Sequence, residues 1–348
     1  MHDTKRASNE ETTVKLTSVL AISVAAAFMA LATPSYAEVS ELEVAEQYGI
    51  SYLPMMIMED QKLVEKYAKE EGIPDLKVSW AKFAGGNVMN DALLSGSLHF
   101  ASGGVAPLIT LWAKTRTNYQ IKAVSALNSM PLYLTTNDPN VKTIKDFTDK
   151  DKIALPAVKV SIQAVTLQMA AEQAFGPGQQ NKLDSLTVSM SHPDGETALL
   201  SGDSEITGHF SSPPFQYQEL AAPHIHTVLD SYQVLGGPAS FNLIWTTTKF
   251  RNENPKVYAA FFKALNDAIG QINKDKSWAA DAYLRISKDR DTKAHILGML
   301  NDPNVVFTTT PQNVLKYVNF MNKIGSIKAQ PTSWKDLFFP EVYALPGS

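Results

Sequence analysis

Short segments with alternating hydrophobic and polar residues are separated along this chain by longer segments in which apolar residues recur at helical spacing. Residues 41–47 alternate apolar and acidic positions, which predicts a strand with one polar face. Residues 55–71 place Leu63, Val64 and Tyr67 on one helical face and stop at Gly72. Further strands are expected at 76–83, 99–101 and 121–127, and helices at 88–95, capped by Asn87, and at 106–114. This order of strand, loop and helix is typical of a helix-covered parallel sheet.

The second half of the chain repeats this order with different loops. The expected strands are 132–136, 152–155, 186–189, 206–210, 226–229 and 241–247. The expected helical segments between them are a turn at 144–147 and helices at 161–175 and 195–201. From Pro255 onward the pattern is helical throughout, with helices at 257–274, 278–286, 292–300 and 312–324.

The two series of α/β segments predict two lobes, because the chain crosses between them near residues 134–140 and 238–247. Lobe one comprises 38–136 and 242–348, and lobe two comprises 137–241. We expect an α/β fold in which each lobe is a mostly parallel sheet flanked by helices. Two strands join the lobes as a hinge, which is the construction of a clamp that closes on a ligand.

The first 37 residues have the pattern of a secretory signal peptide. Lys5, Arg6 and Lys15 precede the apolar run Leu16–Ala32, and small residues at the −3 and −1 positions place a cleavage site after Ala37. The alternative is an N-terminal anchor helix, since the run reaches the lower limit for a membrane span, about 17–25 residues. The Pro and turn that follow favour cleavage, and no cysteine follows that could carry a lipid. We therefore expect an exported, periplasmic protein.

Composition excludes several classes of function. The formal net charge of −4 leaves no basic surplus for nucleic acid. The complete absence of cysteine excludes disulfides, thiolate metal sites, iron–sulfur clusters and a cysteine nucleophile. Beyond residue 37 no apolar run approaches the length of a membrane span. Residues 38–348 exceed one typical domain of about 100–200 residues, which agrees with two lobes.

The candidate ligand-binding residues lie in the loops that follow predicted strands. Ligands of open α/β sheets bind outside the carboxyl ends of the strands, and helix N-termini there supply free N–H groups. The candidates are Tyr48, Ser51, Tyr52, Phe83, Gly86, Asn87, Gly104, Asn128, Lys159, Ser161, His209, Phe210, Ser212 and Phe241. Each also has an ordinary structural interpretation: the glycines as tight turns, the aromatic residues as core, and Lys159 as an exposed lysine.

The sequence contains no pattern for catalysis, a metal or a cofactor. His224 and His226 would share one face of a strand, but no carboxylate precedes Asp230 and no HExxH occurs. No GxSxG accompanies His209, and the glycine pairs form neither GxGxxG nor a phosphate loop. We therefore predict no catalytic residues, no metal and no cofactor.

Five segments together resemble one family of transport proteins, and the resemblance extends along the whole of residues 38–348. They are YGISYLP at 48–54, FAGGNVMNDALLSGSLHFASGGVAP at 83–107, TIKDFTDKDKIALP at 143–156, GHFSSPPFQYQEL at 208–220, and the tail from TPQNVLKYVNF to FFPEVY at 310–343. The chain resembles the periplasmic substrate-binding proteins of ABC importers for nitrate, sulfonates and taurine, a family that also includes binders of thiamine precursors. The resemblance implies the two-lobed periplasmic-binding-protein fold and delivery of a ligand to a membrane permease and its ATPase. One enzyme with this fold makes a thiamine precursor with a cysteine-rich run, which this chain lacks.

The candidate loops favour an organic ligand over a small inorganic anion. They hold one lysine, one histidine and no arginine, too few donors to compensate a buried isolated charge. They also hold several aromatic residues and Met130, which suit a flat or partly apolar molecule with one acidic group. An aromatic carboxylate, an aromatic sulfonate and a pyrimidine all fit. The sequence favours a monomeric binding protein, and it leaves open an exported enzyme acting in the same cleft or a ligand-sensing partner of a membrane receptor.

Overall fold

The computed structural model describes residues 38–348, which form one compact unit. The predicted signal peptide and its cleavage site after Ala37 lie outside the described residues. Within residues 38–348, no helix combines the length and apolar character that a membrane span needs.

One group of strands comes from both ends of the described chain. β1 (Glu41–Glu46) pairs in parallel with β2 (Lys77–Lys82), and β1 is bridged to β3 through Val44 and Phe100. The remaining strands of this group are β3 (Ala101–Gly104), β4 (Lys122–Ala126), β5 (Asn128–Ser129), β11 (Asn242–Thr246) and β12 (Val306–Phe307). β11 lies between β3 and β4 and runs antiparallel to both, and β12 runs antiparallel to β5.

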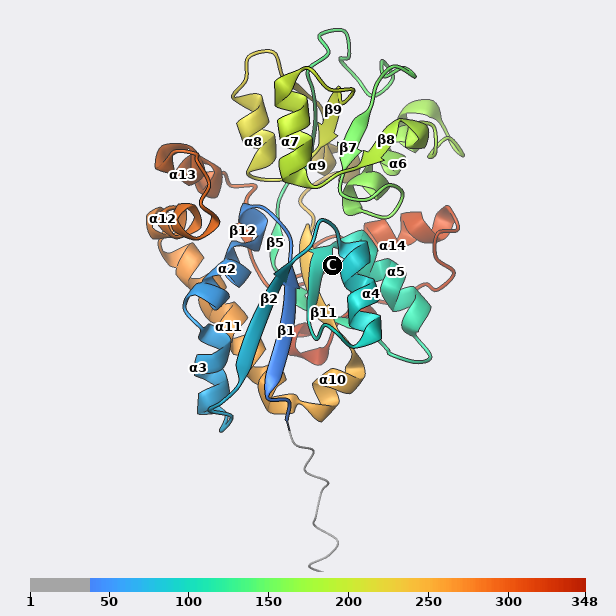
Figure 1. The fold of residues 1–348 in the computed structure, drawn as a ribbon. Coiled ribbons are helices and arrows are strands. Elements are labelled where there is room, and N and C mark those ends of the chain that lie inside the picture. Colours follow the sequence, from blue (N-terminus) through green and yellow to red (C-terminus); the bar gives the residue numbers. More distant parts are fainter. Residues whose placement is uncertain (1–37) are drawn as a thin grey trace, which may run out of the picture. The chain divides into compact units, whose positions relative to one another are not determined.

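The other group is a five-stranded sheet in the order β10-β6-β9-β7-β8. Its strands are β6 (Tyr133–Thr136), β7 (Ile153–Leu155), β8 (Thr187–Ser189), β9 (Gly208–Phe210) and β10 (His226–Asp230). β7 is parallel to β8 and β9, whereas β6 is antiparallel to β9 and β10. In Figure 1 this sheet and α6–α9 lie at the top, with the other strands below.

The sheets are thus mixed, and the expectation that each is mostly parallel is wrong at β6, β11 and β12. β6 and β11 run antiparallel to their neighbours. The chain enters the five-stranded sheet at β6 and returns to the other group at β11. A helical crossover between neighbouring strands keeps them parallel, but β6 and β11 each follow a strand of the other group and not a neighbour in their own sheet. The division into two strand groups agrees with two lobes, whose boundaries stay a prediction.

Helices cover both strand groups. They are α2 (Leu53–Asp60), α3 (Leu63–Glu70), α4 (Gly86–Ser95), α5 (Val105–Thr115), α6 (Ile162–Phe175), α7 (His192–Ser201), α8 (Phe215–Leu220), α9 (Ser231–Leu235), α10 (Thr248–Glu253), α11 (Pro255–Lys274), α12 (Lys276–Ser287), α13 (Lys293–Asn301) and α14 (Val314–Lys323). Four short 3-10 turns are Ile50–Tyr52, Asp184–Leu186, Trp334–Leu337 and Pro340–Val342.

Several predicted helices differ from the observed ones. The helix expected at 55–71 is two helices, because Lys62 adopts a left-handed conformation with φ 50°. The expected turn at 144–147 is present at residues 144 and 145, and the C-terminal region is not wholly helical because β12 interrupts it. Asn87 lies inside α4, and Gly85 is the N-cap.

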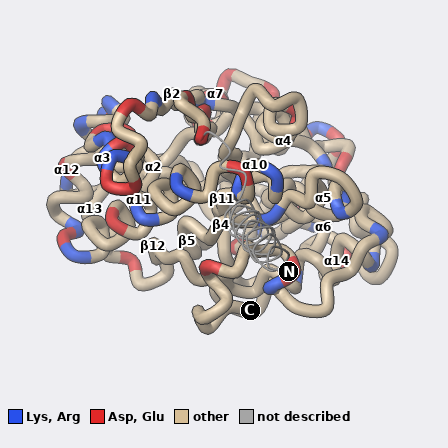
Figure 2. Tube along the Cα trace, turned by 90° about the horizontal axis from the view of Figure 1, so that it is seen from below, with Lys and Arg blue, Asp and Glu red and all other residues tan. Residues whose placement is uncertain are grey.

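The N-terminal helices pack against helices from the end of the chain. α11 lies against α2 and α3, and Arg285 of α12 donates two hydrogen bonds to Asp60 of α2, at 2.6 and 2.7 Å. Figure 2 shows that basic and acidic residues are interspersed along α3 and α12. Neither helix therefore has a face of one charge. Such exposed pairs contribute little each, and the apolar face of α11 supplies most of the contact.

Candidate functional site

A small cavity lies where the two strand groups meet. Its first wall comes from the N-terminal and C-terminal segments: Gln47, Tyr48, Tyr52, Gly86, Gly104, Pro107, Phe241 and Asn242. Its second wall comes from the segments around the five-stranded sheet: Pro156, Ser161, Ile162, Gln163, His192 and Ser212. The cavity volume is about 20 Å³, enough for about one water molecule. Larger hollows lie elsewhere, including one of about 630 Å³ beside Lys114, Arg116 and Lys328. The small cavity is the candidate site because it lies among the strand ends and helix starts described below.

Four helices begin at the cavity. α4 starts at Gly86, α5 starts directly after Gly104, α6 starts at Ile162, and α7 starts at His192. The first N–H groups of a helix lack an intrahelical acceptor, and this end carries positive partial charge. No Asp, Glu, Lys or Arg side chain lines the cavity. The site therefore offers directed N–H groups and positive partial charge without a fixed cation.

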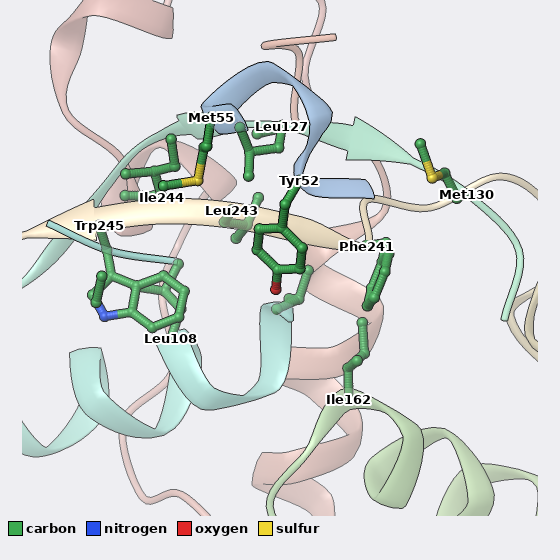
Figure 3. Close-up of a cluster of buried hydrophobic side chains, with 14 of the residues drawn as sticks. Tyr52, Met55, Leu108, Leu127, Met130, Ile162, Phe241, Leu243, Ile244 and Trp245 are labelled. Carbon is green, nitrogen blue, oxygen red and sulfur yellow. The ribbon is translucent and has the colours of Figure 1, made fainter. Parts of the chain in front are cut away.

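The first wall is an aromatic surface held by buried amides. Figure 3 shows Tyr52 and Phe241 side by side, with Ile162 of α6 pointing toward Phe241. The Tyr52 hydroxyl donates to Asn242 Oδ1 at 3.2 Å. Asn128 donates through Nδ2 to the Ser51 carbonyl at 2.7 Å, and its Oδ1 accepts from the Asn242 N–H. These bonds fix the two rings, because each amide is fully buried and has its partners.

A buried glutamate lies behind the first wall. Glu46 is 0% exposed and neither carboxylate oxygen accepts a hydrogen bond, although Lys82 Nζ lies 3.3 Å from Oε1. Burial, offset in part by Lys82, raises the pKa of Glu46 to about 7. Burial and then the nearby Glu46 charge raise the pKa of Tyr52 well above its ordinary value, so Tyr52 stays a neutral donor.

The second wall carries the polar groups that face the cavity. Ser161 caps α6 by accepting from the Ala164 N–H. Gln163 Nε2 lies 3.2 Å from His192 Nε2, and the His192 ring stacks on Phe215. The Ser212 hydroxyl is fully buried, lines the cavity and has no hydrogen-bond partner. A buried hydroxyl without a partner is costly, and a bound ligand would satisfy it.

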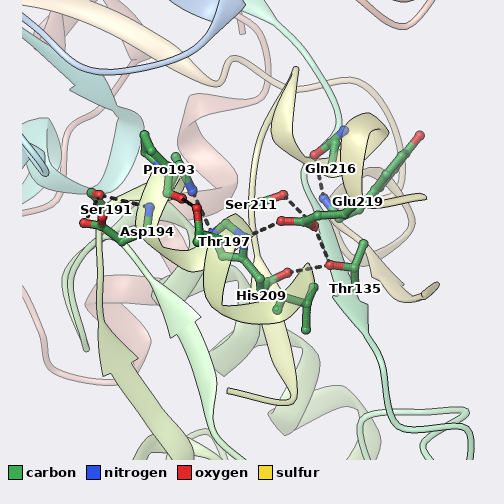
Figure 4. A network of polar contacts seen from close by, with 12 residues as sticks. Thr135, Ser191, Pro193, Asp194, Thr197, His209, Ser211, Gln216 and Glu219 are labelled. Carbon is green, nitrogen blue, oxygen red and sulfur yellow. Dashed lines mark hydrogen bonds and ion pairs between the residues drawn. The ribbon is translucent and has the colours of Figure 1, made fainter. Parts of the chain in front are cut away.

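Behind His192 a chain of hydrogen bonds runs into the five-stranded sheet. His192 Nδ1 lies 3.0 Å from His209 Nε2, and His209 Nδ1 lies 2.5 Å from Glu219 Oε1. Figure 4 shows His209 and Glu219 joined in this way, with Thr135 and Ser211 donating to the other oxygen of Glu219 at 2.6 and 3.4 Å. Burial, and then the charge of His209, lower the pKa of His192 well below its ordinary value, so its ring is neutral.

The two walls touch where glycine removes a side chain. A β-carbon at Gly104 would lie 2.5 Å from Ile162 Cγ2, and one at Gly49 would lie 2.8 Å from the Pro213 carbonyl oxygen. Either is closer than real β-carbons approach other atoms. Tyr317 of α14 and Thr166 of α6 add a hydroxyl–hydroxyl contact at 3.0 Å. Such close contacts indicate that the two walls are in a closed arrangement. The cavity of about 20 Å³ is therefore far smaller than the volume of about 300–1,000 Å³ that a drug-sized ligand needs.

The structure separates the predicted site residues into three groups. Those on the cavity wall are Tyr48, Tyr52, Gly86, Gly104, Ser161, Ser212 and Phe241. Those directly behind the wall, bonded to lining residues, are Ser51, Asn128 and His209. Those away from the lining are Phe83, Asn87, Lys159 and Phe210. Lys159 and Asn87 are exposed, and Phe210 is fully buried opposite Leu134 within the sheet.

Sequence reasoning did not identify several lining residues. They are Gln47, Pro107, Pro156, Ile162, Gln163 and His192. His192 was missed because the helix was expected to start at residue 195, whereas α7 starts at His192. The signal was present: Ser191 caps the helix and Pro193 stands in its first turn, both typical of a helix start.

The site offers no centre for metal or nucleophilic chemistry. Among residues 38–348, no group of three or more His, Cys, Asp or Glu side chains could hold a metal ion. Ser212 has no base, because its hydroxyl lacks a partner and the His192 nitrogens face Gln163 and His209.

Solved structures with this arrangement of sheets and helices identify the fold. No family model and no curated protein sequence matches the chain. The alkanesulfonate-binding protein SsuA from Xanthomonas axonopodis pv. citri, bound to MOPS, is 16% identical with a TM-score of 0.64, over 83% of this chain and 93% of that one. A Candida albicans gene product described as having the generic periplasmic binding protein fold is 18% identical, with a TM-score of 0.63 over 84% and 92%. Residues 38–348 have the periplasmic-binding-protein fold.

A third structure of this fold is the periplasmic nitrate-binding protein NrtA from Synechocystis PCC 6803. It is 14% identical with a TM-score of 0.62, and the match covers 84% of this chain and 83% of that one. The predicted two-lobed α/β fold is thereby confirmed. Identities this low establish the fold alone.

Proposed function

We propose that this protein is the solute-binding component of an ABC importer, exported to the periplasm by its first 37 residues. Lobe one (38–136 and 242–348) and lobe two (137–241) close on a small organic ligand, and the closed form docks directly on a membrane permease, which acts with its ATPase. The observation that carries the proposal is the uncharged cavity between the two strand groups, which four helix N-termini surround. A ligand that contacts both walls only in the closed state shifts the protein toward that state.

The ligand that fits best is a flat or partly apolar molecule with one acidic group. Tyr48, Tyr52 and Phe241 supply ring faces, whereas the helix N-termini and the Ser212 hydroxyl supply donors for the acid. The similar fold of an alkanesulfonate-binding protein bound to MOPS, which combines a ring with a sulfonate, supports this choice. The absence of a nucleophile with a base, or of a metal cluster, among the described residues favours a binder over an enzyme.

A thermal-shift screen of residues 38–348 tests the proposal. The panel contains benzoate, benzenesulfonate and a pyrimidine, with nitrate and taurine as small-anion comparisons. A ligand at one hundred times its Kd stabilises the fold by about 2.7 kcal/mol. We expect the larger shifts with ring compounds, and a response to nitrate or taurine alone would contradict the ligand class. Chromatography of each incubated ligand checks the enzyme alternative, because an importer component returns it unchanged.

Two further measurements test export and partner. N-terminal sequencing of protein recovered from the periplasm should begin at Glu38, and a retained leader would contradict cleavage after Ala37. Light scattering should give a monomer. A transport component with its ligand bound should stimulate the ATPase of a reconstituted importer. The partner of a membrane receptor should not.

A further inference from the structure

Two stretches of the chain contain no acidic residue. Neither residues 92–137 nor residues 303–335 hold an Asp or Glu, although the whole chain has a formal net charge of −4. α5 lies in the first stretch and α14 in the second, and the two helices pack side by side (Figure 1). Trp112 of α5 also donates through Nε1 to the carbonyl of Asp336, the residue that follows the second stretch, at 3.1 Å. Folding therefore joins two acid-free stretches on one side of the strand group that contains β1.

Four cations of these stretches lie around two neighbouring hollows. One hollow, of about 370 Å³, is lined by Arg116 and Lys122. The other, of about 630 Å³, is lined by Lys114, Arg116 and Lys328. Arg116 thus belongs to both hollows, and its guanidinium lies 5.2 Å from the centre of the Trp112 ring. These four cationic side chains form a continuous basic face.

The charges of the basic face are not neutralised by neighbouring acids. Among residues 38–348, none of its four cations forms an ion pair, whereas Lys323 of α14 pairs with Glu172. The acid that lines the smaller hollow is Asp336, and its carboxylate accepts instead from Thr332 and Ser333. A face with an excess of one charge attracts groups of the opposite charge, even on a protein whose net charge is negative.

The basic face is not built as a pocket for one anion. Such a pocket directs buried donors at a single point, but Lys114, Arg116 and Lys328 are exposed and Lys122 is half-buried. Exposed cations distributed over two hollows can instead contact several anionic groups at once. This arrangement suits a surface that carries many anions.

The turn between Arg116 and Lys122 adds an exposed aromatic residue. Tyr119 is 42% exposed, and tyrosine is enriched where proteins meet the headgroup region of a bilayer. The same turn is held to α10, because Thr248 donates through its N–H to the Tyr119 carbonyl and through Oγ1 to the Gln120 carbonyl, at 3.3 and 2.5 Å. An aromatic ring among cations favours a lipid surface over a purely acidic protein segment.

α10 also lies beside the point where the predicted signal peptide joins the chain. Asn254 directly follows α10 and accepts from the Val39 N–H through Oδ1 at 2.8 Å, and the Glu38 carboxylate accepts from the N–H groups of Lys256 and Val257. α10 has six residues, a rise of about 9 Å. The basic face and Glu38 therefore lie at the same end of this strand group. A signal peptide still in the membrane is joined to the protein at this end.

We propose that the basic face binds the anionic headgroups of a lipid bilayer. The proposal rests on the proposed export to the periplasm, where a membrane surface adjoins the protein. Each cation beside an anionic bilayer strengthens binding about fivefold, so four cations together strengthen it several hundredfold. The contact holds the protein at the membrane that contains the permease.

The basic face and the ligand cavity can be occupied together. α5 begins at the cavity with Val105, and Arg116 follows its last residue. The 11 residues of the helix separate the two sites by about 16 Å. Lipid binding should therefore leave ligand binding unchanged.

Sedimentation with lipid vesicles tests the proposal on residues 38–348. The protein should sediment with vesicles of equal parts phosphatidylglycerol and phosphatidylcholine, and not with phosphatidylcholine alone. The triple variant Lys114→Gln, Arg116→Gln and Lys328→Gln should bind about a hundredfold more weakly. Salt at about 1 M screens charges beyond about 3 Å and should release the wild-type protein. Equal binding to the two kinds of vesicle would overturn the proposal.

The matched control removes three exposed lysines beside the five-stranded sheet. The variant Lys142→Gln, Lys145→Gln and Lys150→Gln has the same net charge as the test variant, but its lysines stand among acids such as Asp146 and Asp149. Its vesicle binding should equal that of the wild type. Equal losses in the two variants would assign the effect to net charge and contradict a specific face. Both variants should unfold near the wild-type temperature, because the replaced side chains are exposed.

Two other occupants would give different results. Binding of a polyglutamate peptide without binding of anionic vesicles would indicate an acidic protein partner. A saturable thermal shift with inorganic phosphate that the triple variant loses, again without vesicle binding, would indicate a site for a free anion. Either result would overturn the assignment to a lipid surface.

Failure of this proposal is distinguishable from failure of the proposed function. The ligand screen reports on the cavity, and the triple variant should give the same thermal shifts in it as the wild type. A ligand response without vesicle binding would contradict the lipid surface alone. Vesicle binding without any ligand response would contradict the proposed ligand class and support the basic face.

Discussion

The two walls of the cavity differ in what stands behind them. The first wall presents aromatic rings held by the amides of Asn128 and Asn242, and its buried carboxylate, Glu46, has no hydrogen bond. The second wall presents Gln163, His192 and Ser212, and its buried carboxylate, Glu219, accepts from two hydroxyls and a histidine.

This difference shows how burial acts on a carboxylate. Without donors, burial favours the neutral acid, and the pKa of Glu46 rises to about 7 despite Lys82. Glu219, by contrast, has hydrogen-bond partners at both oxygens, which offset the cost of its burial. The first wall thus provides ring faces, and the second wall provides uncharged polar groups.

The largest difference should separate a residue of the cavity wall, Tyr48, from a residue of the five-stranded sheet, Phe210. Phe210 is fully buried opposite Leu134, so Phe210→Ala should lower the free energy of unfolding by about 3–5 kcal/mol. Tyr48 is on the cavity wall and 37% exposed, so Tyr48→Ala should change stability by roughly 0.5 kcal/mol or less while weakening ligand binding. Urea denaturation and calorimetry check the pair, and equal stability losses would contradict the placement.

The next effect concerns Glu46. Its folded pKa of about 7 exceeds the ordinary 4.5, so the folded state holds an extra proton and this contribution to stability is lost as pH rises from 4.5 through 7. Glu46→Gln should therefore stabilise the protein relative to wild type by up to about 3 kcal/mol at pH 8, and by little below pH 4.5.

The control for Glu46 lies on the same two strands. Glu46 faces Lys82 across β1 and β2, and Glu41 faces Lys77 in the same register but is exposed. Glu41→Gln should leave the difference curve flat in denaturation series from pH 4 to 8. A flat curve for Glu46→Gln as well would show that its burial has no energetic consequence.

A smaller effect tests the contact between the walls. Gly104 has φ −63° and ψ 159°, which alanine adopts readily, so Gly104→Ala perturbs only the contact with Ile162. We expect a loss of about 1–3 kcal/mol in stability, and an increased radius of gyration by small-angle scattering as the walls separate.

Gly270→Ala is the matched control for Gly104→Ala. Gly270 lies within α11 and has no atom near its β-position, so the substitution should stabilise the helix by roughly 1 kcal/mol or less. An unchanged radius of gyration and stability for Gly104→Ala would show that the walls do not press together there.

The smallest effect concerns the hydroxyl of the first wall. Tyr52→Phe removes the hydrogen bond to Asn242 and should cost about 0.5–1.5 kcal/mol in thermal unfolding. Tyr119→Phe, at an exposed tyrosine, is the comparison and should have no measurable effect. Equal values for the two variants would show that the Asn242 contact contributes nothing.

Local patterns predicted most elements but few of their ends. The alternation at β1 and the apolar face of α11 are local properties, and both elements form close to where they were expected. Lys62 was not predicted to break a helix, because its left-handed conformation follows from packing of α2 and α3 on α11. The rule that ligands bind at strand ends selected Tyr52, Ser161 and Phe241, which share one cavity lining, but it also selected Phe83 and Lys159, which lie away from it.

The sequence by itself determined the α/β order and the uncharged, cysteine-free character of the loops, because periodicity and composition are properties of neighbouring residues. It also carries the leader pattern of the first 37 residues, whose export role stays a prediction. Tertiary structure decided which loops meet. Gly104 lies against Ile162, and His192 contacts His209, only because folding brings together segments that are distant in sequence. The direction of a hydrogen-bond chain depends on which donor faces which acceptor, and only the folded chain brings those atoms within 3 Å.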